Sequence, residues 1–119
     1  MIYRKSTALR KPISRLGFGT CQIGRPTIFG GKQIGMGFID EKEARYAINY
    51  AVEHGVNFFD TADIYGKGLS EKLLGKALRG KIDDLIICTK CGNKELSNGK
   101  TVRDFSATWL EAAVDGSLK

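Results

Sequence analysis

Proline, cysteine and histidine are scarce in the 119-residue sequence, which contains two, three and one of them, respectively. Two prolines beside 15 glycines indicate tight turns between regular elements rather than a disordered linker. An odd number of cysteines argues against the disulfide framework of a secreted domain, so a reducing cytoplasm is the expected location. With one histidine, a zinc site would depend on cysteines whose spacing does not favour it, and we expect no metal.

Long hydrophobic runs are also missing. No segment approaches the ~20 apolar residues of a membrane span, and the first six residues lack the apolar core of a signal peptide. The formal charge is +6, and the scattered basic residues favour a solvated surface over one that attracts phosphates. No aromatic residues interleave with them as in a groove for single strands, so we expect neither nucleic acid nor a membrane as a partner. The nearest approach to a basic cluster is Arg4, Lys5, Arg10, Lys11 and Arg15.

The best-defined predicted element is a helix that follows Asp40. Asp40 can cap this helix, and Glu43, three residues later, fits the reciprocal position of a capping box. Gly55 suits the position just after the helix. The spacing of the apolar residues places one face toward a core. That face consists of Ala44, Ala47, Ile48, Ala51 and Val52.

Two more helices are predicted, with Ser70 and Ser106 as their N-caps. The second carries Leu73, Leu74, Ala77 and Leu78 on one face and ends at Gly80. The third carries Leu110, Ala113, Val114 and Leu118 on one face.

Strands are predicted at 16–20, 56–59 and 85–88, a hairpin at 3–5 and 13–15, and a long loop at 24–39. The continuous apolar run at 85–88 is typical of a parallel strand that is covered on both faces. The alternation of strand and helix predicts an α/β fold with a parallel sheet. The pattern leaves both a doubly wound sheet and a barrel open.

Polar residues follow each of these three strands, where parallel α/β folds place their functional groups. Gly19, Thr20 and Cys21 follow the first strand, the segment 60–66 follows the second, and the segment 89–92 follows the third. If the strands are neighbours, the carboxylate of Asp60, the phenol of Tyr65 and the amine of Lys90 meet at one rim.

These three groups make chemical sense together. A tyrosine hydroxyl has an ordinary pKa of ~10, and a nearby ammonium makes such a group a better proton donor near neutrality. Tyr65 would be a general acid tuned by Lys90, and Asp60 would orient the lysine. Taken singly, Asp60 could cap a turn, Tyr65 could be a packed loop aromatic and Lys90 a solvated lysine. Their position at consecutive strand ends favours catalysis.

The run 55–66, Gly-Val-Asn-Phe-Phe-Asp-Thr-Ala-Asp-Ile-Tyr-Gly, resembles a signature of the aldo-keto reductases. The segments 16–20, 70–78 and 87–90 and the third helix support this resemblance, which covers almost the whole chain and is weakest in 24–39. It implies a (β/α)8 TIM barrel that binds NADP(H) and transfers hydride to or from a small-molecule carbonyl substrate.

The resemblance also implies roles for single residues. Asp60, Tyr65 and Lys90 match three members of a catalytic tetrad. Gly19, Thr20 and Cys21 match the loop beside the nicotinamide and the substrate, and Asp60 matches a contact to the nicotinamide ribose. Cys21 stands where many relatives carry Trp.

The fourth tetrad member, a His at the end of the next strand, is expected after Lys119. His54 lies at the end of the first predicted helix, where the helix dipole favours it, and is no substitute. A barrel of this kind needs ~250 residues. Residues 1–119 are therefore expected to form the N-terminal portion of one barrel domain, a hairpin plus about three βα units, and to be inactive alone.

Cys88 and Cys91 form a C-x-x-C pattern. A redox dithiol usually opens a helix, whereas an extended backbone holds these two Cα atoms ~10 Å apart, beyond the ~7 Å that a disulfide allows. A redox or metal role is disfavoured.

Two other functions stay open at this point. One is a non-catalytic interaction module, since potassium-channel β subunits resemble the same family. The other is a partial barrel that is completed by further copies of the chain. The presence of Asp60, Tyr65 and Lys90 favours catalysis over both.

Overall fold

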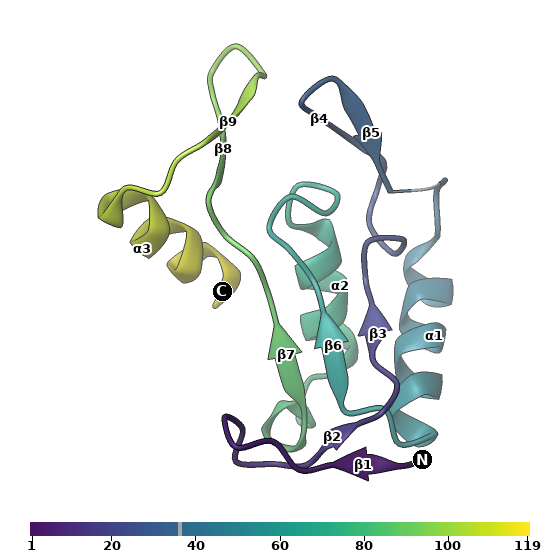
Figure 1. Cartoon of the computed structure of the whole chain (residues 1–119). Helices are drawn as coiled ribbons and strands as arrows, with labels where there is room; N and C mark the ends of the chain where they lie inside the picture. Colours follow the sequence, from purple (N-terminus) through teal and green to yellow (C-terminus); the bar gives the residue numbers. More distant parts are fainter. Residues whose placement is uncertain (36) are drawn as a thin grey trace.

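Three short parallel strands form the centre of the computed structural model, which describes residues 1–35 and 37–119. They are β3 (Phe18–Gly19), β6 (Phe58–Asp60) and β7 (Ile86–Cys88), in the spatial order β3-β6-β7 (Figure 1). Gly19 pairs with Asp60, and Asp60 pairs with Cys88, so the three strands end at one level. The predicted parallel sheet is confirmed.

Two helices cover one face of this sheet (Figure 1). They are α1 (Glu41–Glu53) and α2 (Leu69–Ala77). The Asp40 side chain accepts a 2.8 Å hydrogen bond from the Glu43 backbone N–H, which confirms the predicted cap of α1. Gly55, which follows the helix, has φ +85° and so takes the left-handed conformation that favours glycine.

The hydrophobic core lies between these helices and the sheet. Phe59 is completely buried at its centre, and its ring lies 5.8 Å from that of Phe18. The apolar faces predicted for the first two helices supply most of the other side chains, which confirms their orientation. The buried apolar residues of this cluster are Ile23, Ala44, Ile48, Ala51, Phe59, Leu73, Leu74, Ala77 and Leu78.

The start of α2 differs from the prediction. Gly68, with φ +82°, occupies the N-cap position, and Ser70 lies inside the first turn, where it is completely buried. Three successive residues, Gly66, Lys67 and Gly68, have positive φ, so the chain turns sharply before the helix begins. The prediction of Ser70 as the cap was wrong because the turn required glycine at the position where the helix starts.

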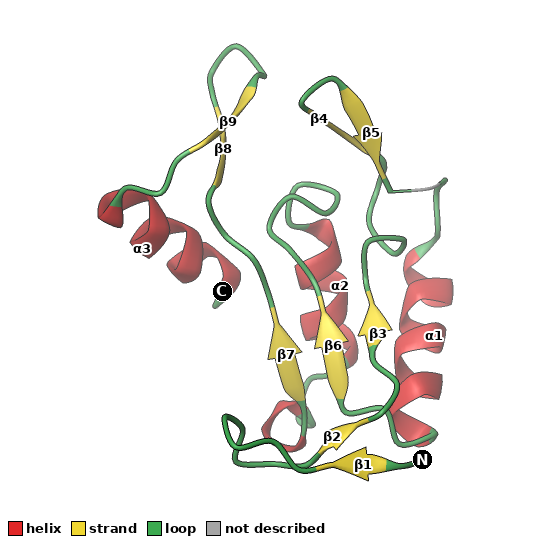
Figure 2. Cartoon of the chain, viewed as in Figure 1, coloured by secondary structure: helices red, strands yellow, loops and turns green. Residues whose placement is uncertain are grey.

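Two antiparallel hairpins lie beyond the C-terminal ends of the strands (Figure 2). The first, β4 (Thr27–Phe29) and β5 (Lys32–Ile34), replaces the loop predicted for 24–39, within which residue 36 lies outside the described part. Its turn residues Gly30 and Gly31 both have positive φ, as tight hairpin turns require. The second, β8 (Asn93–Glu95) and β9 (Thr101–Arg103), was not predicted.

The third helix, α3 (Ala107–Ser117), begins as predicted, since the Ser106 hydroxyl accepts a hydrogen bond from the Trp109 backbone N–H. Hydrogen bonds from the Ser106 hydroxyl and backbone N–H and from Lys94 lower the pKa of Asp104 to about 2. The predicted apolar face of α3 is not buried, because Val114 is 48% and Leu118 is 80% exposed.

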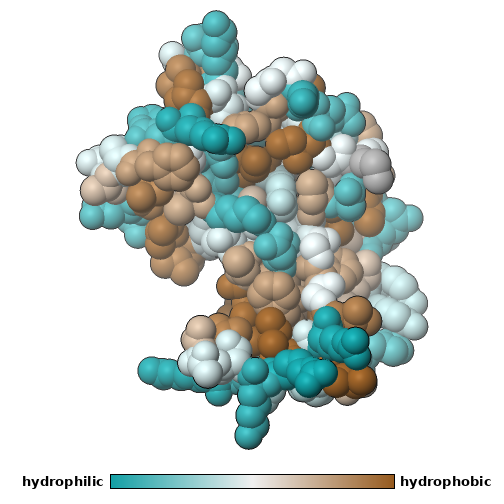
Figure 3. Space-filling model, viewed as in Figure 1, coloured by the Kyte–Doolittle hydropathy of each residue, from teal (hydrophilic) through white to brown (hydrophobic). Residues whose placement is uncertain are grey.

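The expectation that 85–88 is covered on both faces is also wrong for this chain. β7 stands at one edge of the three-stranded sheet, and Ile87 is 39% exposed. Figure 3 shows apolar atoms gathered in a hollow of the surface over this part of the sheet. A short 3-10 helix, η1 (Ile82–Asp84), leads into the strand.

The predicted hairpin of β1 (Tyr3–Arg4) and β2 (Ile13–Ser14) is confirmed and lies at the opposite end of the sheet from β4–β5 (Figure 1). Asn57 holds it in place, because its backbone N–H donates to the Ser14 hydroxyl and its side chain donates to the Pro12 carbonyl. These contacts explain why β6 begins two residues later than predicted.

The strand order follows the chain order, and both crossover helices lie on the same side of the sheet. A doubly wound sheet places helices on both faces. The arrangement therefore favours the barrel over the doubly wound sheet. Within residues 1–35 and 37–119, no helix has the length and apolar character needed to cross a membrane.

We expect Phe59→Ala to lower the free energy of unfolding by about 3–5 kcal/mol, because it opens a cavity at the centre of the core. Urea unfolding monitored by circular dichroism measures this loss. Phe38, which is 84% exposed, provides the matched control, and Phe38→Ala should change stability by no more than ~0.5 kcal/mol. Equal losses in the two variants would contradict the placement of the core.

Candidate active site

The ammonium group of Lys90 is the centre of the candidate site. Its Nζ atom lies 2.6 Å from Oδ1 of Asp60, 2.8 Å from the Thr61 carbonyl oxygen and 3.5 Å from the Tyr65 hydroxyl. It also lies 5.2 Å from the centre of the Tyr65 ring. The structure thus brings together the three groups that the sequence placed at consecutive strand ends.

Each of these groups is positioned by a different element. Asp60 is the last residue of β6, and Lys90 follows β7 by two residues. Tyr65 lies in the loop before α2, where its backbone N–H donates to the Ala62 carbonyl and its own carbonyl accepts from Ser70. Parallel pairing of β6 and β7 brings Asp60 and Lys90 to one level, and the tight loop after β6 places Tyr65 beside them.

The electrostatics of Lys90 favour the charged amine. Partial burial by itself would lower the pKa of this ammonium, but the hydrogen bond to Asp60 and the charges of Tyr65 and Asp60 outweigh burial and raise the pKa above its usual value. The side chains of Lys90 and Asp60 are 46% and 39% exposed, so solvent screens their attraction. The pair therefore matters as a fixed positive charge beside the phenol more than as a source of stability.

The segment predicted to lie beside a cofactor has two distinct parts. Gly19 pairs with Asp60, and a Cβ atom built on it would meet nothing within 4 Å, so open space lies in front of the strand end there. Thr20, in contrast, is completely buried, and its hydroxyl donates a 3.0 Å hydrogen bond to the Asp60 carbonyl. Cys21 is half-buried. Their contacts to a cofactor stay predictions.

Sequence reasoning missed the buried hydroxyls behind the rim. The Ser70 hydroxyl donates to the Thr20 carbonyl at 2.9 Å and lies 3.4 Å from the Thr61 hydroxyl. A serine in front of an apolar helical run is typical of an N-cap. The same pattern therefore gave no indication that Ser70 is a buried hydrogen-bond donor. Gly68 was the available signal, because a glycine two residues earlier can itself start the helix.

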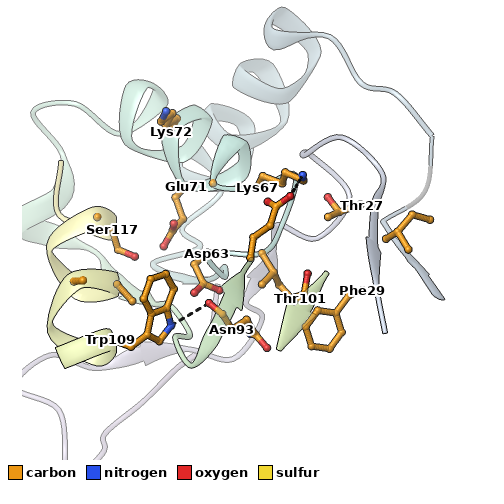
Figure 4. A pocket seen from close by; sticks show the side chains of 17 residues that line it. Thr27, Phe29, Asp63, Lys67, Glu71, Lys72, Asn93, Thr101, Trp109 and Ser117 are labelled. Atoms are coloured by element: carbon orange, nitrogen blue, oxygen red, sulfur yellow. Dashed lines mark hydrogen bonds and ion pairs between the residues drawn. The ribbon is translucent and has the colours of Figure 1, made fainter. Parts of the chain in front are cut away.

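A separate cavity of about 390 Å³ lies between α2, α3 and the two hairpins. Asp63, Glu71, Asn93 and Trp109 are among its lining residues, and Figure 4 shows Trp109 beside Asn93, whose carbonyl accepts a 3.2 Å hydrogen bond from the indole N–H. Asp60, Tyr65 and Lys90 do not line this cavity. This cavity was not predicted from the sequence, because the β8–β9 hairpin that forms one of its walls was not predicted either.

Asp63 is the unusual group in the wall of this cavity. Burial raises the pKa of its carboxyl, and the negative charge of Glu71 adds to the effect. Hydrogen bonds from the Ile64 backbone and the Asn93 side chain offset part of the shift. Oδ1 of Asp63 is buried and has no hydrogen-bond partner among the residues that the structure describes.

All three cysteines are free thiols. Cys88 is exposed, and Cys91 is half-buried. In the part of the chain that the structure covers, no three His, Cys, Asp or Glu side chains gather as potential metal ligands.

Comparison with known proteins gives a consistent result. A model of the aldo/keto reductase family matches residues 15–119. The chain is 36% identical over 110 residues to the L-galactose dehydrogenase of Arabidopsis thaliana, covering 90% of this chain and 30% of that protein. It is 32% identical over 109 residues to the pyridoxine 4-dehydrogenase of Escherichia coli, covering 92% and 36%.

Solved structures agree with these relatives. The holo form of an aldo-keto reductase from Bacillus halodurans superimposes with a TM-score of 0.79 at 35% identity, covering 99% of this chain and 35% of that one. The predicted fold, a partial (β/α)8 barrel, is confirmed. The chain spans about a third of the length of these relatives.

We expect Asp63→Asn to stabilise the protein at neutral pH. The folded-state pKa of Asp63 is raised, so the folded protein holds this proton more tightly than the unfolded chain, and stability falls as the pH rises through the folded pKa. Asn carries no charge to bury, so the variant should gain in melting temperature at pH ~7 and lose that gain in acid, where Asp63 is protonated.

Thermal unfolding at several pH values tests this expectation. Asp83→Asn, in the exposed η1 helix, is the matched control and should change stability at neutral pH by no more than ~0.5 kcal/mol. A destabilised Asp63→Asn variant at neutral pH would show that the carboxylate of Asp63 makes a favourable interaction.

Proposed function

Because the chain belongs to the aldo/keto reductase family, we propose that it forms the catalytic rim of an oxidoreductase that uses NADP(H). The substrate would be a small aldehyde or ketone, or an alcohol in the reverse direction. The observation that carries the proposal is the position of one ammonium, Lys90, within 3.5 Å of both a carboxylate and a phenol at the C-terminal ends of parallel strands.

Tyr65 is the general acid in this proposal. Carbonyl reduction needs a proton at the carbonyl oxygen, and the Tyr65 hydroxyl carries one at the open rim. The Lys90 ammonium, 3.5 Å away, stabilises the negative charge that develops on the phenolic oxygen as the proton leaves. Asp60, 2.6 Å from that ammonium, holds it in place and balances its charge.

The residues at the rim fit the nicotinamide-ribose part of NADP(H). Gly19 leaves open space beside Asp60, and the second oxygen of the Asp60 carboxylate can accept a hydrogen bond from a ribose hydroxyl. Cys21, half-buried at the end of the same segment, would border the nicotinamide and the substrate. When bound, NADP(H) supplies or accepts the hydride, while the protein positions the carbonyl and moves the proton.

The family resemblance implies a fourth catalytic group, a His on a further strand, which lies outside residues 1–119. The protein chemistry available within these residues is therefore the phenol, the ammonium and the carboxylate. A reducing cytoplasm fits the three free thiols and is the proposed location.

We expect Tyr65→Phe to lower kcat for carbonyl reduction by about 10²–10⁴-fold in the protein expressed from the complete gene, because the variant has no proton to donate. Absorbance of the reduced nicotinamide measures turnover. Tyr46→Phe is the matched control, because Tyr46 is 70% exposed on α1, and it should keep full activity. Unchanged turnover in Tyr65→Phe would remove Tyr65 from the mechanism.

We expect residues 1–119 alone to show no steady turnover of NADPH with any carbonyl compound. The reason is that residues 1–119 contain neither a complete barrel nor the fourth catalytic group that the family resemblance implies. The same absorbance assay, with the complete gene product as a positive control, measures this. Steady turnover that disappears in the Tyr65→Phe version of the short chain would overturn the expectation.

A further inference from the structure

Ser70 lies behind the rim, in the first turn of α2, and is completely buried. We infer that Ser70 is a positioning residue whose hydroxyl and backbone hold the segments of Asp60, Tyr65 and Lys90 in their relative places. This inference rests on the proposed function, because Asp60, Tyr65 and Lys90 are catalytic only in that proposal. Ser70 would fix the relative positions of these three groups without touching their reactive atoms.

The contact to the Tyr65 segment is made by the backbone. The Ser70 N–H donates a 3.2 Å hydrogen bond to the Tyr65 carbonyl. Since Ser70 is fixed in α2, this bond ties the backbone of Tyr65 to the helix. Three successive residues with positive φ separate Tyr65 from α2. The bond from Ser70 spans this turn and limits where the Tyr65 phenol can point.

The contact to the Asp60 segment passes through Thr20. The Ser70 hydroxyl donates to the Thr20 carbonyl at 2.9 Å. Thr20 in turn donates two bonds to the Asp60 carbonyl, from its backbone N–H at 2.9 Å and from its hydroxyl at 3.0 Å. A shift of Thr20 would therefore shift the backbone that carries the Asp60 carboxylate.

The contact to Lys90 passes through Thr61. The hydroxyls of Ser70 and Thr61 are 3.4 Å apart, and the Thr61 carbonyl accepts a 2.8 Å hydrogen bond from the Lys90 ammonium. The Thr61 N–H also donates to the Cys88 carbonyl on β7, the strand that leads to Lys90. Ser70 is thus linked to Asp60 through Thr20 and to Lys90 through Thr61. It bonds directly to the backbone of Tyr65.

The test compares Ser70→Ala with Ser14→Ala in the protein expressed from the complete gene. Ser14 is also buried, at 4% exposure, and its hydroxyl donates to the Leu16 carbonyl at 2.7 Å, but it lies in β2 at the opposite end of the sheet. Each variant removes one buried hydroxyl, so both should lose similar stability in urea unfolding.

Only Ser70→Ala should change catalysis. We expect its kcat to fall about 10–100-fold with KM nearly unchanged, since a misplacement of about 1 Å can cost ~10²-fold in rate. Ser70→Cys replaces the hydroxyl with a somewhat larger thiol that is a weaker donor, and it should retain the fold with an intermediate kcat. This second variant keeps the comparison decisive if Ser70→Ala does not fold.

A second measurement separates this inference from the proposed function. NMR titration of the Lys90 side chain should show its raised pKa moving toward the ordinary lysine value in Ser70→Ala, or in Ser70→Cys, and staying in place in Ser14→Ala. This measurement needs no turnover, so it tests Ser70 even if the unmodified protein reduces no carbonyl compound, which would overturn the proposed function alone. Identical kcat and Lys90 titration in the Ser70 and Ser14 variants would overturn the inference.

Discussion

Successive side chains along β6 point to opposite faces of the sheet, and this alternation links the hydrophobic core to the rim. Phe59 is completely buried against the helices, so Asp60, one residue later, has to lie on the open face. A slip of one residue would expose Phe59 and bury the carboxylate, and the loss of core packing opposes such a slip. The core therefore fixes the orientation of the candidate catalytic acid, although it makes no contact with the chemistry itself.

The register of the neighbouring strands then decides which groups meet Asp60. Gly19 on one side adds no side chain, which leaves room at the rim, and Cys88 on the other side leads within two residues to Lys90. The glycines on either side of Lys67, directly after Tyr65, allow the chain to turn sharply into α2, whose Ser70 N–H then holds the Tyr65 carbonyl. A carboxylate, an ammonium and a phenol thus meet without any long connection.

How far the sequence predicted this arrangement depended on how local the signal was. The α1 cap at Asp40 and the buried faces of α1 and α2 follow from spacing within a few residues, and they were predicted. The meeting of Asp60, Tyr65 and Lys90 was predictable because parallel strands bring their C-terminal ends together. The β4–β5 and β8–β9 hairpins were missed, although Gly30–Gly31 and Asn98–Gly99 are typical hairpin turns. The role of Ser70 was not predictable from local pattern, since a cap and a buried clamp share the same sequence context.

Of the three catalytic candidates, Lys90 has the least support from packing. Asp60 follows the buried Phe59, and Tyr65 is anchored by α2, whereas Lys90 follows β7, whose residue Ile87 is 39% exposed. The apolar face of α3 has no fully buried residue and adds no core behind this strand. The position of Lys90 therefore depends on its bonds to Asp60 and to the Thr61 carbonyl. The same bond to Asp60 helps to keep the amine charged, so position and charge come from one interaction. Any change that loosens Asp60 or Thr61 should consequently affect Lys90 before it affects the core.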